Sequence, residues 1–170
     1  PLAASIHAVV IAGSSGYGNY RHQADAAHAY HTLLAHGVPA ANLILLSADD
    51  AATSPWNPEP GTLYNRPGGP DVRAGAPVDY SGESVTAASF LAVLLGDARG
   101  AAAAAPNSTR RVLNSAPRDR VLVVYIDHGA PGLLGMPAGP PLLAPDLLAA
   151  LRNMTARRDA TAVDRARDAV

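Results

Sequence analysis

Three short runs of apolar residues impose the strongest constraint on how this chain can fold. They cover Ile6–Ala12, Leu43–Ser47 and Val121–Ile126, and each has the length of a strand rather than of a membrane-spanning helix. A continuous apolar run of this length is typical of a strand that is buried on both faces of a sheet. We therefore expect three buried strands and no membrane partner.

Residues with helical spacing lie between and after these runs. Helices are expected over about 23–36, 87–95 and 145–154. Gly37 is placed to end the first helix, Thr86 can cap the second, and Pro145 suits the first turn of the third. The order of strand and helix, repeated three times, predicts an α/β fold with a mainly parallel sheet flanked by helices.

The last part of the chain departs from this alternation. Residues 155–170 are polar and contain no run that could form a buried strand. A helix that ends near Met154 should return the chain to a fourth strand, so we expect a sheet that is incomplete at its C-terminal side, with one exposed edge. The predicted organisation is one domain over 1–154 and a divergent polar tail over 155–170. Residues 51–85 are expected to form a long loop. Residues 96–118 are expected to be an Ala-rich, Arg-bearing connection.

The composition excludes several classes of site. The chain has no cysteine, which rules out disulfides, thiolate zinc sites and a thiol nucleophile within these 170 residues. All 13 basic residues are arginine, so a P-loop lysine and a Schiff-base lysine are excluded too. With a formal net charge of −1, we expect no nucleic-acid partner, and no cofactor is predicted. The oligomeric state stays open. The chain begins with Pro1, and we expect that an upstream segment precedes it.

Polar residues follow the first and the third expected strand. The two loops read Asn19-Tyr20-Arg21-His22 and Asp127-His128-Gly129. Because ligands of open α/β sheets bind at the carboxyl ends of the strands, both loops are expected on one rim. His128 is the sharper candidate, since histidine can transfer a proton near neutral pH and the N–H of Gly129 can approach a developing oxyanion. The alternative is a structural histidine in a tight turn.

Two further patterns suggest other functions. Gly13, Gly16 and Gly18 form a glycine-rich loop, but its G-x-x-G-x-G spacing is not that of the dinucleotide fingerprint. Asp49 and Asp50 follow the second strand, where paired acids either hold a metal or form a solvated turn. A nucleotide-binding α/β domain is therefore one alternative, and no metal site is predicted.

Longer motifs are spread over about residues 6–154. They are Gly13–Asp25, Asn65–Val72, Asp79–Thr86, Phe90–Leu94, Gly96-Asp97 and Asp127–Gly129. Together they resemble the signatures of the legumains, the asparaginyl endopeptidases. The catalytic subunit of the glycosylphosphatidylinositol transamidase is an alternative, because it shares the Asn-Tyr-Arg-His run and the His-Gly turn. Its long loop lacks the Asn-Arg-Pro-Gly stretch, so legumain fits better.

The resemblance implies a caspase-like α/β fold and a cysteine-type endopeptidase. Such an enzyme cleaves peptide or protein substrates after Asn and, at lower pH, after Asp. By resemblance, His128 is the catalytic histidine, Asn19 orients its ring, and Gly129 offers an N–H to the oxyanion.

The same resemblance implies a substrate pocket beside the histidine. Arg21 and His22 would line it, because an arginine can pair with a side-chain carbonyl or carboxylate. Asp127 would support the histidine as a structural or electrostatic partner. A vacuolar or lysosomal location, reached through the secretory pathway, is also implied.

The sequence departs from the legumain pattern at the nucleophile. Legumains carry it in a Glu-Ala-Cys-Glu-Ser-Gly run at the end of the next strand, and this chain has neither that run nor any cysteine. We therefore expect the chain to be inactive alone, as an incomplete catalytic domain from a truncated or alternatively spliced product. The alternative is a non-catalytic pseudo-peptidase that binds peptides or a partner.

Overall fold

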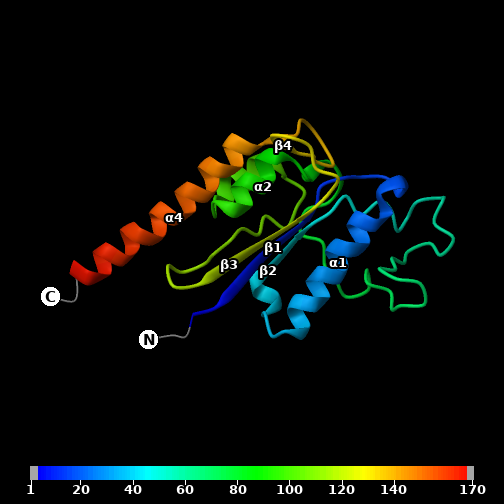
Figure 1. Cartoon of the computed structure of the whole chain (residues 1–170), viewed down its shortest axis with the longest axis horizontal. Coiled ribbons are helices and arrows are strands. Elements are labelled where there is room, and N and C mark those ends of the chain that lie inside the picture. The colour runs from blue at the N-terminus through cyan, green and yellow to red at the C-terminus, as the bar shows by residue number, and fades with distance from the viewer. Residues whose placement is uncertain (1–3, 168–170) are drawn as a thin grey trace.

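The centre of the fold is a three-stranded parallel sheet (Figure 1). The computed structural model describes residues 4–167, with side chains described as far as Arg157. The strands are β1 (Ile6–Ala12), β2 (Leu43–Leu46) and β3 (Arg120–Ile126), in the order β2-β1-β3. All three coincide with the apolar runs to within one residue, so the predicted α/β fold with a parallel sheet is confirmed.

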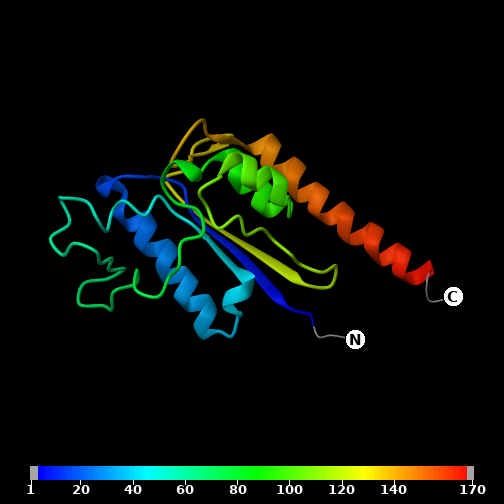
Figure 2. The ribbon, with the colours of Figure 1, turned by 180° about the vertical axis from the view of Figure 1, so that it is seen from behind.

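Helices cover both faces of this sheet (Figures 1 and 2). One face packs on α1 (Tyr20–Ala35), and the other on α2 (Ala87–Leu94), with α3 (Ala98–Ala104) and α4 (Ala144–Arg167) beside it. Successive side chains of β1 point to opposite faces, as the two-residue period of a strand requires. Val10 thus belongs to the core under α1, whereas Val9 and Ile11 belong to the core under α2.

The helix boundaries follow local signals, with three differences from the prediction. The helix α1 begins at Tyr20, three residues earlier than expected. The connection over 96–118 contains the helix α3, whose first turn is capped by the Asp97 carboxylate through the Gly100 N–H. The expected end near Met154 is wrong, because α4 continues to Arg167. No proline or glycine occurs between Met154 and Arg167 to stop it.

The remaining elements are short. They are the 3₁₀ turns η1 (Tyr17–Asn19), η2 (Ala40–Asn42) and η3 (Gly82–Ser84), and an antiparallel pair of β4 (Leu133–Leu134) and β5 (Leu142–Leu143). The division into a domain over 1–154 and a tail over 155–170 stays a prediction. Within the described residues, the helices are too short or too polar to cross a lipid bilayer.

The two outer edges of the sheet differ. The long loop over 51–85 covers the edge of β2. There, the Asp79 N–H donates to the Leu45 carbonyl at 2.8 Å, and the Ser47 N–H donates to the Tyr80 carbonyl at 3.0 Å. Arg111 fixes this loop, since its guanidinium lies 3.1 Å from the buried carboxylate of Asp79. The edge of β2 is therefore protected.

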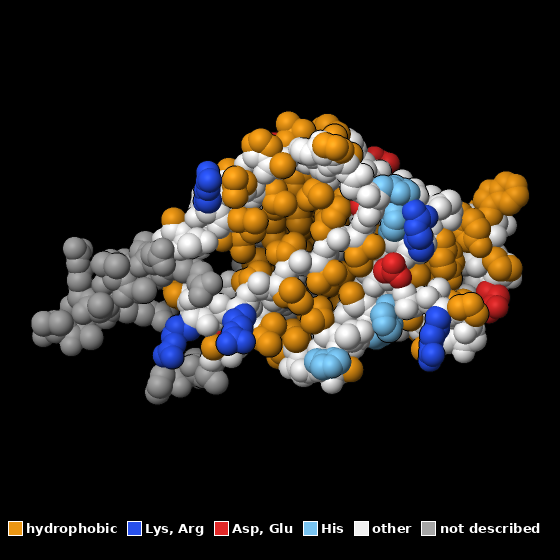
Figure 3. Space-filling view, in the orientation of Figure 1, with side chains coloured by type: hydrophobic (Ala, Val, Ile, Leu, Met, Phe, Trp, Pro, Cys, Tyr) orange, Lys and Arg blue, Asp and Glu red, His pale blue; other side chains and the backbone are white. Residues whose placement is uncertain are grey.

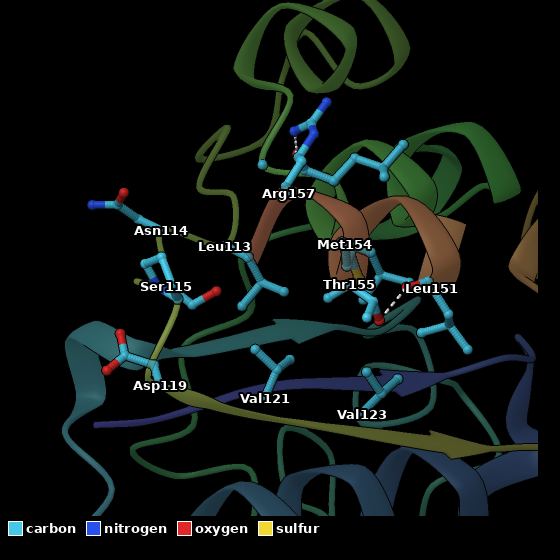
Figure 4. A pocket seen from close by; sticks show the side chains of 14 residues that line it. Leu113, Asn114, Ser115, Asp119, Val121, Val123, Leu151, Met154, Thr155 and Arg157 are labelled. Carbon is cyan, nitrogen blue, oxygen red and sulfur yellow. Dashed lines mark hydrogen bonds between the residues drawn. The ribbon is translucent and has the colours of Figure 1, made fainter. Parts of the chain in front are cut away.

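The edge of β3 is open. Among residues 4–167, β3 pairs only with β1, and the Leu122 side chain within it is 43% exposed. An apolar hollow of about 460 Å³ lies between β3 and α4, where Val121 and Val123 face Leu151 and Met154 (Figure 4). The space-filling view shows the same area as a hydrophobic surface between the strands and the upper helices (Figure 3). The expected exposed edge is thus confirmed.

An open strand next to an apolar hollow predicts self-association, because unpaired N–H and C=O groups serve as a template for another strand. We expect the average mass of the chain to rise with concentration up to roughly 100 µM. Leu122→Lys should return it toward the monomer, since a charge on an edge strand opposes pairing. Leu143→Lys is the matched control, because Leu143 is 49% exposed but lies in β5. Sedimentation velocity measures both; a wild-type chain that stays monomeric over this range contradicts the prediction.

Candidate active site

The parallel pairing of β1 and β3 brings two distant loops together. Ala12 and Ile126 are partners at the ends of these strands, so the residues that follow leave the sheet at the same rim. The first loop leads through η1 into α1, and the second holds residues 127–129. The predicted convergence of the two loops is confirmed by side-chain contacts that span more than 100 residues of sequence.

His128 is held from both sides of its ring. Its Nε2 lies 2.9 Å from the Asn19 Oδ1, and its Nδ1 lies 3.2 Å from the Arg21 guanidinium. A guanidinium can only donate, so Nδ1 carries the lone pair and the proton resides on Nε2, which donates to Asn19. The Asn19 amide is itself fixed, because its Nδ2 donates to the Ser15 carbonyl at 3.0 Å. These contacts leave Nδ1 as the basic nitrogen of an exposed histidine.

His22 lies buried behind His128. The two rings meet edge to face, with centroids 4.7 Å apart, and the His22 Nδ1 lies 2.7 Å from the Ser14 Oγ. Burial lowers the pKa of His22, and the nearby Arg21 lowers it further, whereas Asp127 acts in the opposite direction. His22 is therefore neutral at neutral pH. Ser14 and Asp127 both approach the same nitrogen of His22, so the three do not form a serine-histidine-aspartate relay.

The Asp127 carboxylate points inward from the rim. Its side chain is 6% exposed, and its Oδ2 accepts a hydrogen bond from the Tyr125 hydroxyl at 3.2 Å. Its Oδ1 lies 3.5 Å from the His22 Nδ1 but has no hydrogen-bond partner among the described residues. Burial, and then the charge of Asp127, raises the pKa of Tyr125, which keeps its hydroxyl protonated as a donor.

The glycine-rich loop packs against Tyr125 instead of enclosing a space that could hold a phosphate. A Cβ on Gly13 would lie 2.1 Å from the Tyr125 hydroxyl oxygen. The Gly16 N–H, which a phosphate would need, donates to the Asp50 carboxylate at 2.8 Å. Asp49 pairs with Arg73 through two hydrogen bonds of 2.8 Å. These contacts support a structural role for the loop and for both aspartates, and they speak against the nucleotide and metal alternatives there.

Gly129 lies at the outer end of the site. It is exposed and has a φ of 77°, a conformation that favours glycine. Its backbone is therefore accessible on the same rim as the His128 ring. The sequence did not single out Ser14, Tyr125 or Gly135, which support the site from below, Gly135 through its carbonyl, which accepts from the Tyr125 hydroxyl. The sequence holds a signal for Tyr125 alone, because the alternation of side chains along β3 places it on the α2 face with Val123.

The close approach at Gly13 generates a stability prediction. Gly13→Ala should lower the free energy of unfolding by about 1–3 kcal/mol, because the new methyl group overlaps the rigid Tyr125 ring. Gly18→Ala is the matched control in the same loop, since its Cβ would meet open space and should change stability by less than about 0.5 kcal/mol. Denaturant titration measures both, and equal effects of the two substitutions would be inconsistent with this packing.

Comparison with known proteins agrees with this geometry. The sequence matches the Peptidase C13 family over residues 6–163. It is 52% identical over 146 residues to the vacuolar-processing enzyme beta-isozyme of Arabidopsis thaliana, an alignment that covers 86% of this chain and 29% of that protein. It is 47% identical to the legumain of Canavalia ensiformis, with 86% and 30% covered. The chain thus spans less than a third of the length of these relatives. It belongs to the peptidase C13 family of cysteine peptidases.

Proposed function

We propose that this chain supplies the general base and part of the substrate pocket of an endopeptidase that cleaves after Asn and, at lower pH, after Asp. The single observation that supports this is the state of His128. Asn19 accepts from its Nε2–H, so the basic lone pair is on Nδ1, which contacts the exposed Arg21 guanidinium and becomes free when Arg21 turns to the substrate. Gly129 would then offer its N–H to the oxyanion, and Asp127 supports the rim from below.

The nucleophile has to come from outside these 170 residues, which contain no cysteine. A cysteine peptidase needs a thiolate beside its base. A strand that paired in parallel with the open edge of β3 would end on the rim where His128 stands. We infer that such a strand carries the thiol, and that the chain alone does not cleave peptides. The open edge of β3 also supports the second candidate function, peptide binding by a non-catalytic fragment, because peptide binding needs no nucleophile.

Arg21 is proposed as the group that recognises the substrate side chain. It is exposed, and its guanidinium lies 3.2 Å from the His128 ring, where a peptide would have to pass. A guanidinium donates to an amide carbonyl or to a carboxylate, which suits Asn and Asp alike. The neutral ring of His22 lies edge to face behind the His128 ring.

The cellular location and the substrates of the reaction are proposed from the names of the relatives. Three of them, from Arabidopsis thaliana, Phaseolus vulgaris and Glycine max, are named vacuolar-processing enzymes. We infer a vacuolar or lysosomal location and protein substrates for this chain. A role like that of the glycosylphosphatidylinositol transamidase subunit is a weaker alternative, because the names of the relatives do not support it.

Calorimetric titration with a short peptide tests the binding part. An Asn-containing peptide should bind more tightly than the same peptide with Ala in place of Asn. Arg21→Ala should weaken the affinity for the Asn peptide by about 10- to 100-fold, which is the effect of losing one charge-assisted hydrogen bond. The matched control is Arg99→Ala, which changes an exposed arginine on α3, outside both rim loops.

Two results would count against the proposal. Equal heats for the Asn and Ala peptides would show that this rim does not recognise the Asn side chain. Cleavage of the peptide by the pure chain, abolished by His128→Ala, would show that the nucleophile does not have to come from elsewhere.

A further inference from the structure

The rim also gathers the donor atoms of a metal site. His22, Asp127 and His128 each present one ligand atom, and these atoms lie within 4.8 Å of one another. Two imidazoles and one carboxylate are the protein ligands of several catalytic zinc sites, which keep a fourth position open. We propose that these three residues bind one divalent transition-metal ion of the zinc class.

The buried half of this site is already arranged for a metal. The His22 Nδ1 and the Asp127 Oδ1 lie 3.5 Å apart. Two ligands of a tetrahedral zinc ion, each about 2.0–2.1 Å from it, are separated by roughly 3.4 Å. The His128 ring has to move inward by on the order of 1 Å to complete the triangle. Its exposed position on the rim permits that movement.

The unpaired oxygen of Asp127 is the second observation that points to a cation. Its Oδ1 is buried and accepts no hydrogen bond from the described residues, an arrangement that costs stability when a charge is involved. The Tyr125 hydroxyl, which also donates to the Gly135 carbonyl, reaches the other oxygen, Oδ2, and not Oδ1. A metal ion at Oδ1 would supply the positive charge that the carboxylate lacks.

Two contacts oppose the ion and have to be given up. The Ser14 hydroxyl lies 2.7 Å from the His22 Nδ1 and must rotate away. The Arg21 guanidinium lies 3.2 Å from the His128 Nδ1, where its positive charge repels a cation. Arg21 is exposed and can swing into solvent, so the two compete for one nitrogen. Removing Arg21 should therefore strengthen metal binding, whereas it should weaken peptide binding.

A bound ion would occupy the lone pair that we assign to the general base. Metal and substrate would then exclude each other at His128. The metal site itself does not depend on the proposed peptidase function, because it rests on the three ligand atoms alone.

The experiment titrates the complete chain with Co²⁺, followed by its visible absorption, and then displaces Co²⁺ with Zn²⁺. We expect one ion per chain. His128→Ala should weaken binding by roughly tenfold or more, and this exposed residue can be changed without disturbing the core. Arg21→Ala should tighten binding by about two- to fivefold, the range of a single exposed charge interaction. The control is the double variant His28→Ala, His36→Ala, which removes two exposed histidines of α1 and its end.

The outcomes separate the possibilities. Loss of binding with His128→Ala and retention with the control support the site. Unchanged binding with His128→Ala, or loss only in the control, would overturn it, as would weaker binding after Arg21→Ala. Asp127→Asn gives a second check, read together with its circular dichroism so that unfolding is recognised. Failure here leaves the peptide titration unaffected, so the two proposals fall separately.

Discussion

The parallel register between β1 and β3 is the constraint on which the rest of the site depends. It sets Ala12 beside Ile126, so the two loops that follow begin side by side although more than 100 residues separate them. Both strands are apolar, and β1 is buried along almost its whole length. A shift of one residue would turn every side chain of β3 to the other face, which the packing of Val123 and Val124 in the cores on opposite faces of the sheet opposes. The burial of the sheet therefore fixes the distance between Asn19 and His128.

The site is built in two layers that differ in exposure. The outer layer holds Asn19, Arg21 and His128, which contact solvent and each other. The inner layer holds His22 and Asp127, which are buried and incompletely neutralised. The outer layer suits proton transfer and substrate recognition, since its groups are accessible and oriented. The inner layer explains why the same rim can also attract a cation. In our two proposals, peptide binding and metal binding are uses of one electrostatic arrangement.

Much of this could be predicted from the sequence, because it depends on patterns local to the chain. The uninterrupted apolar runs defined the strands, and the lack of a fourth run predicted the open edge of β3. Two loops at strand ends predicted the meeting of Asn19 and His128. The alternation along β3 indicated only which face Tyr125 occupies. Its contact with Gly13 could not be predicted, because that contact depends on how two distant strands pack together. The end of α4 was predicted too early. The expectation of a fourth strand was given more weight than the absence of helix-stopping residues after Met154.

The protonation of the His128 ring is the most direct test of this account. Nitrogen-15 NMR of the neutral imidazole should show its proton on Nε2 and the lone pair on Nδ1, because Asn19 accepts from the first and Arg21 donates to the second. Asn19→Ala should weaken this preference without unfolding the chain. A ring protonated on Nδ1, or a tautomer equilibrium that does not respond to Asn19→Ala, would contradict the claim that these residues form the base of a catalytic centre.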